Sequence, residues 1–577
     1  MGLPRPEYPR PQLVRDSWLS LNGVWGFEFD PGLSGIQRGL PQTERLDREI
    51  LVPFCPESPL SGIGDRDFHL GAWYRRQFRI PPDWAGQRVL LHLGAVDHDA
   101  FVWVNGRDAG RHRGGYTPFT LDISPLLVRG ENVLSVHAHD DTRSPLQAGG
   151  KQCPDYHSRG CHYTRTTGIW QTVWLEPVPR VYIDSLRMTP DPANGRLAIK
   201  VEVAGGTSRG AIQARATLHD ETVAEARTRF AGQRALVVLQ LEDAQPWAPE
   251  HPTLYDLHLT LEADDGSRDT VRSYFGLRSL ALTDTAILLN GEPVFQRLVL
   301  DQGFYPDGIY TAPSDEALRD DILISQGLGF NGARLHQKVF EPRFLYWADR
   351  LGYLVWGEFA SWGLDVSDSR ALGTFLPQWL EVLRRDHNHP AIVGWCPFNE
   401  TQPNQDPAVV GNVYRVTKAF DPTRPVIDTS GYQHVETDVY DVHNYTQDPE
   451  TFASLFAPFA SGGEPFRNRP RLDAAYRGQP YFVSEYGGIW WSPGQRDEKG
   501  WGYGGVAARP QSPEEFLSRY RALTETLLRH PRMCACCYTQ LYDIEQEVNG
   551  LYTYERQPKF DPKLIREINS QTAAIEE

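Results

Sequence analysis

Two glutamates in the C-terminal half of the chain stand where apolar runs end. Glu400 closes the segment AIVGWCPFNE (391–400), and Glu485 lies in YFVSEYGG (481–488). Two carboxyl groups that face a common gap can cleave a glycosidic bond, because one protonates the departing oxygen while the other attacks the sugar or activates water. A structural acid paired with an arginine is the alternative for either residue. For two acids at matching positions we favour catalysis.

The segments that carry these acids belong to a repeating pattern that begins after residue 278. Apolar runs alternate with helical stretches such as SDEALRDDILISQGL, EPRFLYWADRLG and SPEEFLSRYRALTETLLRH. Such alternation indicates a parallel sheet covered by helices, and eight runs indicate a TIM barrel over residues 278–577. Strands four and seven of a barrel lie on roughly opposite sides, so Glu400 and Glu485 can meet across its mouth. The eight runs are QRLVLD, FNGARLH, YLVWGEFA, AIVGWCPFNE, PVIDTS, DVYDVHNY, YFVSEYGG and MCACCYTQLYD.

The other polar residues at the ends of these runs are candidates for substrate binding, because barrel active sites lie at the C-terminal ends of the strands. Arg334 could orient Glu485, and His336 could bind a sugar hydroxyl or be a satisfied strand-end histidine. For Glu358, a role in substrate binding and a purely structural role are equally supported by the sequence. Aromatic residues in the loop after Glu485 could stack on a sugar ring or simply pack. The candidates are Asn399, Tyr445, Arg334, His336, Glu358, Asn444, Gln540, Trp490 and Trp491, with Trp501 and Tyr503 in the same aromatic loop.

Two all-β regions precede the barrel. Residues 1–180 contain short alternating or aromatic runs, such as GVWGFEFD and AFVWVNGRDAG, in which VNGRD is a hairpin turn signal. This pattern predicts a β-sandwich of jelly-roll type. Residues 181–277 hold further strands at the spacing of an immunoglobulin-like sandwich, which we expect to act as a spacer.

Composition narrows the range of partners. The chain has 577 residues, 58 basic against 74 acidic side chains, and a formal net charge of −16. We therefore expect no nucleic acid and no anionic membrane as partner. The N-terminus lacks the apolar core of a secretory signal, and no run is long enough to span a bilayer. Seven cysteines do not suggest a disulfide framework. A cytoplasmic protein is the prediction.

One cluster of cysteine and histidine residues could suggest a metal site, but its spacing is not that of a standard zinc motif. Cys153, His157, Cys161 and His162 lie close together in the sequence. Zinc ligands usually come in pairs at regular short intervals, which these residues do not follow. We therefore expect neither a metal nor an organic cofactor.

Four segments resemble glycoside hydrolase family 2, the family of β-galactosidases, β-glucuronidases and β-mannosidases. They are LHLGAVDHDAFVWVNGRDAGRHRGGYTPFTLDIS, TRTTGIWQTVWLEPV, RRDHNHPAIVGWCPFNE and DIEQEVNGLYTYER. The resemblance spans nearly the whole chain and implies a three-domain form. It also implies that Glu400 is the general acid/base and Glu485 the nucleophile of a retaining enzyme. Asn399 would then bind the sugar 2-hydroxyl, and Tyr445 would donate a hydrogen bond to Glu485.

The resemblance leaves the sugar open. An exo-β-glycosidase acting on an oligosaccharide or glycoconjugate is expected, with a β-galactosidase-like activity first and a β-glucuronidase, β-mannosidase or pentosidase as alternatives. Family β-glucuronidases carry an Asn-x-Lys motif, and the loop after Glu485 contains only Lys499. The rival from another class is a carbohydrate-binding protein without turnover. Homo-oligomers, frequent in the family, are also possible here.

Overall fold

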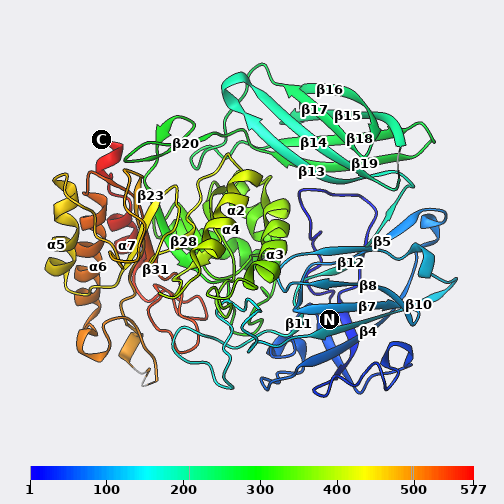
Figure 1. Cartoon of the computed structure of the whole chain (residues 1–577), viewed down its shortest axis with the longest axis horizontal. Helices are drawn as coiled ribbons and strands as arrows, with labels where there is room; N and C mark the ends of the chain where they lie inside the picture. Colours follow the sequence, from blue (N-terminus) through cyan, green and yellow to red (C-terminus); the bar gives the residue numbers. More distant parts are fainter. Residues whose placement is uncertain (1, 207, 496, 498) are drawn as a thin grey trace.

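The computed structural model describes residues 2–206, 208–495, 497 and 499–577. It confirms the predicted fold class, with an N-terminal jelly-roll sandwich, an immunoglobulin-like sandwich and a C-terminal TIM barrel. Figure 1 shows the two sandwiches on the same side of the barrel, the immunoglobulin-like one above the N-terminal one.

The N-terminal domain packs a six-stranded antiparallel sheet, in the order β3-β2-β4-β10-β7-β8, against a four-stranded sheet, in the order β1-β12-β5-β9. Alternate apolar residues of both sheets, such as Val102, Val136 and Leu91, are fully buried between them. The predicted hairpin at Asn105 joins β7 to β8. The strands are β1 (Leu19–Ser20), β2 (Gly23–Phe29), β3 (Arg48–Val52), β4 (Gly71–Arg79), β5 (Arg88–Leu93), β6 (Val96–Asp97), β7 (Asp99–Val104), β8 (Arg107–Arg113), β9 (Phe119–Asp122), β10 (Glu131–His139), β11 (Gly168–Ile169) and β12 (Val173–Val178).

The second domain has a three-stranded sheet, β13-β14-β17, facing a four-stranded sheet, β16-β15-β18-β19. Its core is a separate cluster of aliphatic side chains that includes Ile199, Val237 and Leu259. A short three-stranded sheet then leads into the barrel. These strands are β13 (Tyr182–Asp191), β14 (Arg196–Ala204), β15 (Ser208–Leu218), β16 (Glu221–Gly232), β17 (Arg234–Gln240), β18 (Tyr255–Ala263), β19 (Arg268–Phe275), β20 (Leu280–Leu282), β21 (Ile287–Leu289) and β22 (Glu292–Pro293).

Each of the eight predicted runs supplies a strand of the barrel. Seven strands pair in parallel in the order β26-β25-β24-β23-β31-β30-β29, and β27 pairs with β28. The fifth run completes the circle, because Val426 bridges to Trp395 on one side and its carbonyl accepts from the Asp438 N–H at 2.9 Å on the other. The strands are β23 (Gln296–Asp301), β24 (Gly332–Leu335), β25 (Leu354–Glu358), β26 (Ile392–Cys396), β27 (Phe398–Asn399), β28 (Thr429–Ser430), β29 (Tyr440–Asn444), β30 (Tyr481–Gly487) and β31 (Met533–Thr539).

Helices surround the barrel. Two of them begin after serine residues of the type that commonly caps helix N-termini. Ser314 and Ser512 accept hydrogen bonds from the backbone N–H of the third residue of α1 and α6, and acidic residues occur in both first turns. None of the described helices is long and apolar enough to cross a membrane. The helices are α1 (Asp315–Gly327), α2 (Pro342–Leu351), α3 (Ala371–Asp386), α4 (Pro407–Phe420), α5 (Pro449–Ala460), α6 (Pro513–Leu528) and α7 (Pro562–Asn569).

A long connection of the N-terminal domain, between β10 and β11, docks on the barrel. The Gly149 N–H donates to the Trp362 carbonyl at 2.8 Å, and the Gly150 N–H donates to the Ala360 carbonyl at 3.1 Å. Gly150 has a φ of 59°, and a Cβ there would lie 2.4 Å from the carbonyl oxygen of Gln337. Only glycine allows this close approach, so the local sequence holds the next residue, Lys151, against the loops at the C-terminal ends of the strands.

Candidate active site

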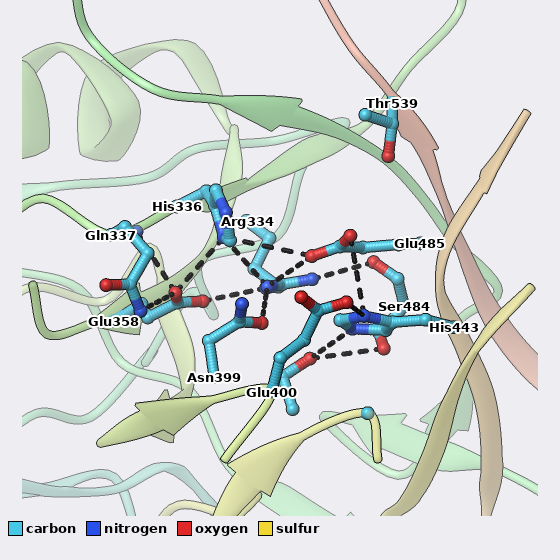
Figure 2. Close-up of polar contacts among 12 residues, drawn as sticks. Arg334, His336, Gln337, Glu358, Asn399, Glu400, His443, Ser484, Glu485 and Thr539 are labelled. Atoms are coloured by element: carbon cyan, nitrogen blue, oxygen red, sulfur yellow. Dashed lines mark hydrogen bonds and ion pairs between the residues drawn. The ribbon is translucent and has the colours of Figure 1, made fainter. Parts of the chain in front are cut away.

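The structure brings Glu400 and Glu485 together at the C-terminal end of the barrel, with His443 of β29 between them (Figure 2). One carboxylate oxygen of each glutamate and Nδ1 of His443 lie within 4.8 Å of one another. Glu400 follows β27, and Glu485 lies in β30. The predicted convergence of two distant strand ends is therefore present.

The backbone at Glu400 is strained in a way that aims its side chain. Its φ is 44°, in the left-handed region that non-glycine residues rarely adopt. The Glu400 N–H donates to the Ser430 carbonyl at 2.9 Å, which holds this conformation. Such strain costs about 1–3 kcal/mol and is concentrated at functional sites.

Arg334 of β24 joins several groups of the site. Its Nη2 donates to a Glu485 oxygen at 2.8 Å and to Oδ1 of Asn399 at 2.7 Å, and its Nε donates to Glu358 at 2.7 Å (Figure 2). Burial acts to lower the pKa of Arg334, but the anions Glu358 and Glu485 outweigh it and raise that pKa well above its ordinary value. Arg334 therefore stays a cation and fixes the orientation of Glu485.

Arg334 makes the contact with Glu485 that was expected of it, but direct substrate binding, for which Arg334 and Glu358 were candidates, is corrected by the structure. Both side chains are 0% exposed, so neither has surface to offer a sugar. Glu358 also accepts from the backbone N–H of Gln337 at 3.0 Å. The two residues form a supporting layer beneath Glu485.

The surroundings of Glu485 favour its ionised form. Burial alone would raise its pKa, but His443, Arg334 and His336, with a hydrogen bond from the Tyr445 hydroxyl, hold the pKa at about 2. The contact from Tyr445 is the one that the family resemblance implied. Glu485 is therefore ionised throughout the pH range in which most enzymes are active.

Asn399 and His336 present polar groups that can meet a ligand. Nδ2 of Asn399 is buried and has no hydrogen-bond partner among the described residues. Burial, followed by the charge of Lys151, holds the pKa of His336 well below its ordinary value. Its Nδ1 lies 2.9 Å from Nη2 of Arg334 and 3.1 Å from a carboxylate oxygen of Glu358. Asn399 thus carries a donor that a sugar hydroxyl could satisfy.

Tyr445 and Tyr503 form a stacked pair beside Glu485. Their ring centroids are 3.3 Å apart and the rings are nearly parallel. Tyr503 is thus the residue of the predicted aromatic loop that reaches the site. Asn444, expected to bind substrate, instead uses its Oδ1 to accept from the Thr446 N–H at 3.0 Å, a local turn after β29.

Gln540 was also expected to bind substrate, but its amide is fully engaged within the protein. Its Oε1 accepts from Gln302 at 2.6 Å and its Nε2 donates to Asn549 at 2.8 Å. The residue is 1% exposed. It packs under the site instead of lining it.

Trp490 and Trp491 are part of the packing behind the barrel mouth, and the prediction of sugar stacking is wrong for both. Nε1 of Trp490 donates to Asp497, and the guanidinium of Arg509 lies 4.4 Å from its ring centroid. Trp491 stacks on Phe560. Both indole faces are occupied or buried, so a pyranose has no access to them.

Sequence reasoning missed Lys151, which the N-terminal domain delivers to the site. The residue is 5% exposed, and its ammonium lies 3.8 Å from the ring centroid of Trp362. Burial acts to lower its pKa, but electrostatic interactions with Cys161, Glu547, Glu485 and Glu400 keep that pKa raised. Among the described residues no carboxylate lies within 4 Å of it. No local pattern could reveal this lysine, because Trp362 and the three glutamates around it lie more than 200 residues away in the sequence.

A cavity of about 390 Å³ opens beside Glu400. Trp362 and Tyr432 are among its aromatic lining residues, and Asn399 and Glu400 also line it. Burial, then the charges of Glu400 and Glu485, raise the pKa of the Tyr432 hydroxyl. Space for a ligand is therefore adjacent to one glutamate while the other is enclosed.

The atoms of Glu400, His443 and Glu485 are close enough to hold a metal ion. Hydrogen bonds already occupy them, and the Arg334 guanidinium beside Glu485 would repel a cation. The cysteine and histidine cluster at 153–162 forms no comparable group within the part of the chain that the structure describes. Its Cys153 thiol instead donates to the His157 carbonyl at 3.3 Å.

Comparison with known proteins agrees with this architecture. Residues 65–174 match the sugar binding domain of "Glycosyl hydrolases family 2", residues 181–278 match the domain described as "Glycosyl hydrolases family 2", and residues 281–497 match its TIM barrel domain. A β-glucuronidase of Paenibacillus borealis is 27% identical over 455 residues, 73% of this chain and 74% of the relative. A β-galactosidase of Thermoanaerobacter pseudethanolicus is 26% identical over 405 residues, 67% of this chain and 52% of the relative.

Solved structures share the fold along the whole chain. A β-glucuronidase from Ruminococcus gnavus in complex with D-glucuronic acid superposes with a TM-score of 0.79 at 18% identity, over 98% of this chain and 99% of that one. The β-D-glucuronidase of Dictyoglomus thermophilum gives 0.78 at 21% identity, over 98% of both chains. With the three domains in family order and a carboxylate pair at the barrel mouth, the chain belongs to glycoside hydrolase family 2 and is a glycoside hydrolase.

Proposed function

We propose that the protein is a retaining exo-β-glycosidase whose nucleophile is Glu485 and whose acid/base is Glu400. The observation that carries the proposal is the distance between the two carboxylates, with oxygens within 4.8 Å of each other. Retaining enzymes hold their carboxyl groups about 5–5.5 Å apart, whereas inverting enzymes need about 6.5–9.5 Å to admit a water molecule.

The environments of the two acids support this division of roles. Glu485 is 4% exposed, and His443 and Arg334 favour its ionised form. A nucleophilic carboxylate must be ionised. Glu400 is 14% exposed and lines the open cavity, where a leaving group can reach it. The more accessible carboxyl can therefore exchange protons with the aglycone and with water.

The reaction then has two displacements. Glu485 bonds to the anomeric carbon as the bond from that carbon to the aglycone oxygen breaks, and Glu400 gives this oxygen a proton. Water next attacks the anomeric carbon, Glu400 takes its proton, and Glu485 departs as a carboxylate. The unpartnered Nδ2 of Asn399 is suited to donate to the 2-hydroxyl, a contact that strengthens in the transition state.

For the sugar we propose a β-glucuronide, in place of the galactosidase-like activity that the sequence put first. Relatives from Paenibacillus borealis and Felis catus and a solved structure from Ruminococcus gnavus are named β-glucuronidases. Lys151 supports the proposal physically, because a buried ammonium without a carboxylate within 4 Å can pair with a uronate. It could provide from the N-terminal domain the positive charge that the loop after Glu485 lacks.

One observation favours a neutral sugar as the second candidate. Glu547 is buried close enough to Lys151 for their charges to interact, and Tyr163 and Asn549 donate to it. If Glu547 neutralises Lys151, the pocket would prefer a galactoside. A binding protein without turnover is less consistent with two intact acids in a hydrogen-bonded setting.

A panel of 4-nitrophenyl β-glycosides tests the proposal. We expect kcat/KM for the glucuronide to exceed that for the galactoside, mannoside and xyloside by at least about 100-fold, which corresponds to the loss of one buried charged contact. Proton NMR of the first product should show the β-anomer. A preference for galactoside would overturn the sugar assignment, and silence on every substrate would favour the binding protein.

A further inference from the structure

The imidazole of His443 connects the two glutamates. Its Nδ1 lies 2.7 Å from Oε1 of Glu400 and 3.4 Å from Oε2 of Glu485, and the ring is 1% exposed (Figure 2). The contact with Glu400 has hydrogen-bond length, and the contact with Glu485 is a longer electrostatic one. A single titratable group therefore faces both acids.

The far side of the ring indicates where its hydrogen lies. Nε2 is 3.1 Å from Oγ of Ser430, whose hydroxyl is 2.7 Å from a carboxylate oxygen of Asp441 and donates to it. Because this hydroxyl has one hydrogen, its oxygen is left to accept from Nε2–H. Nδ1 of a neutral ring then carries a lone pair, and only a proton can join it to a carboxylate oxygen at 2.7 Å.

The fold makes room for this ring. Gly431 has a φ of 66°, and a Cβ there would lie 2.7 Å from three atoms of the His443 ring, including Nδ1. Any side chain at this position would push the imidazole out of line with Glu400.

The charges around His443 come from several strands. Burial acts to lower its pKa, Glu485 and Glu400 raise it, and Arg334 opposes them, with a raised pKa as the result. His336 of the second strand end also interacts with it electrostatically, and Asp441 lies behind Ser430. The anion on Glu485 thus helps to keep a proton beside Glu400.

We propose that Glu400 and His443 share one proton, so that His443 controls the protonation of the acid/base according to the charge on Glu485. The inference rests on the roles proposed above for the two glutamates. While Glu485 is an anion, the pair holds the proton. It passes through Glu400 to the aglycone oxygen as Glu485 bonds to the sugar, and the neutral ester no longer attracts a cation. The proton of the attacking water restores the pair when Glu485 is released.

Leaving-group dependence tests this role. The probes are the phenyl and 2,4-dinitrophenyl β-glycosides of the sugar that the wild-type protein hydrolyses fastest. Dinitrophenolate departs without a proton, so loss of acid catalysis matters only for the phenyl substrate. We expect His443→Asn to lower kcat/KM for the phenyl glycoside by about 100-fold and for the dinitrophenyl glycoside by less than about 10-fold. The alkaline limb of the pH profile should move down by at least about one unit, because an amide cannot hold the proton.

Two further variants separate this role from packing. Gly431→Ala keeps the histidine but displaces its ring, and should show the same difference between substrates. His530→Asn removes another buried histidine, one that contacts the Phe456 carbonyl far from the acids, and should leave the ratio of the two rates unchanged. Equal losses on both substrates with an unmoved pH limb in His443→Asn would overturn the inference. Failure of the wild-type protein to hydrolyse any aryl glycoside would instead overturn the proposed function.

Discussion

The guanidinium of Arg334 lies 2.8 Å from the carboxylate of Glu485, and the two side chains are 0% and 4% exposed. Because both side chains are buried, water cannot take the place of either partner in this ion pair. It joins His443 in holding the pKa of Glu485 at about 2, against the effect of burial. Glu485, the proposed nucleophile, is thus ionised before substrate binds.

Glu485 should stabilise the fold in a pH-dependent way. Its folded pKa lies below the unfolded value of about 4.3, so the contribution is complete above that pH and is lost as pH falls toward about 2. We expect the free energy of unfolding of the wild type, relative to Glu485→Gln, to rise between pH 2 and 4.5 and then to level off. Urea denaturation at a series of pH values measures this. A difference independent of pH would contradict the depressed pKa.

Replacing each catalytic candidate should produce a different defect. Glu485→Gln should abolish turnover, and azide should not restore a β-linked product, because no glycosyl-enzyme can form. Glu400→Ala should still form the glycosyl-enzyme from a dinitrophenyl glycoside, and azide should then give the β-glycosyl azide. Mass spectrometry of the intact protein and NMR of the product distinguish the two. The reverse pattern would exchange the assigned roles.

Lys151 should discriminate substrates by charge. We expect Lys151→Met to lower kcat/KM for an aryl β-glucuronide by about 100-fold and for the matched galactoside by less than about 3-fold, because only the uronate loses an ion pair. Glu547→Gln should shift the preference further toward the glucuronide by removing a nearby negative charge. Equal effects of Lys151→Met on both sugars would mean that the lysine acts only through packing on Trp362.

The two groups of tryptophans should respond differently to substitution. Trp362 lines the cavity beside Glu400, so Trp362→Ala should raise KM for a bulky aryl aglycone by about 10-fold. Trp490 donates to Asp497 and packs under Arg509, so Trp490→Phe should lower Tm while KM stays within about 2-fold. Kinetics and thermal melts on the same preparations check both. An increase in KM for Trp490→Phe would restore the stacking role that the structure rejects.

Several features of the site could be read from the sequence because they depend on local pattern. Apolar runs of strand length marked all eight barrel strands, and the residue after each run marked the end at which polar side chains gather. The meeting of Glu400 and Glu485 could be predicted without further information, since barrel geometry alone places strands four and seven on opposite sides of the mouth. Tyr445 and Asn399 followed from the same rule.

What the sequence determined was the order of the domains, the strands of the barrel and the two acids that it presents. The tertiary structure alone decided which neighbours face the substrate, because burial and direction depend on contacts between distant segments. It enclosed Arg334 and Glu358 beneath Glu485, packed Trp490 and Gln540 away from the cavity, and brought Lys151 in from another domain. It also set His443 between the acids, a position created by three separate strand ends and by the open backbone of Gly431.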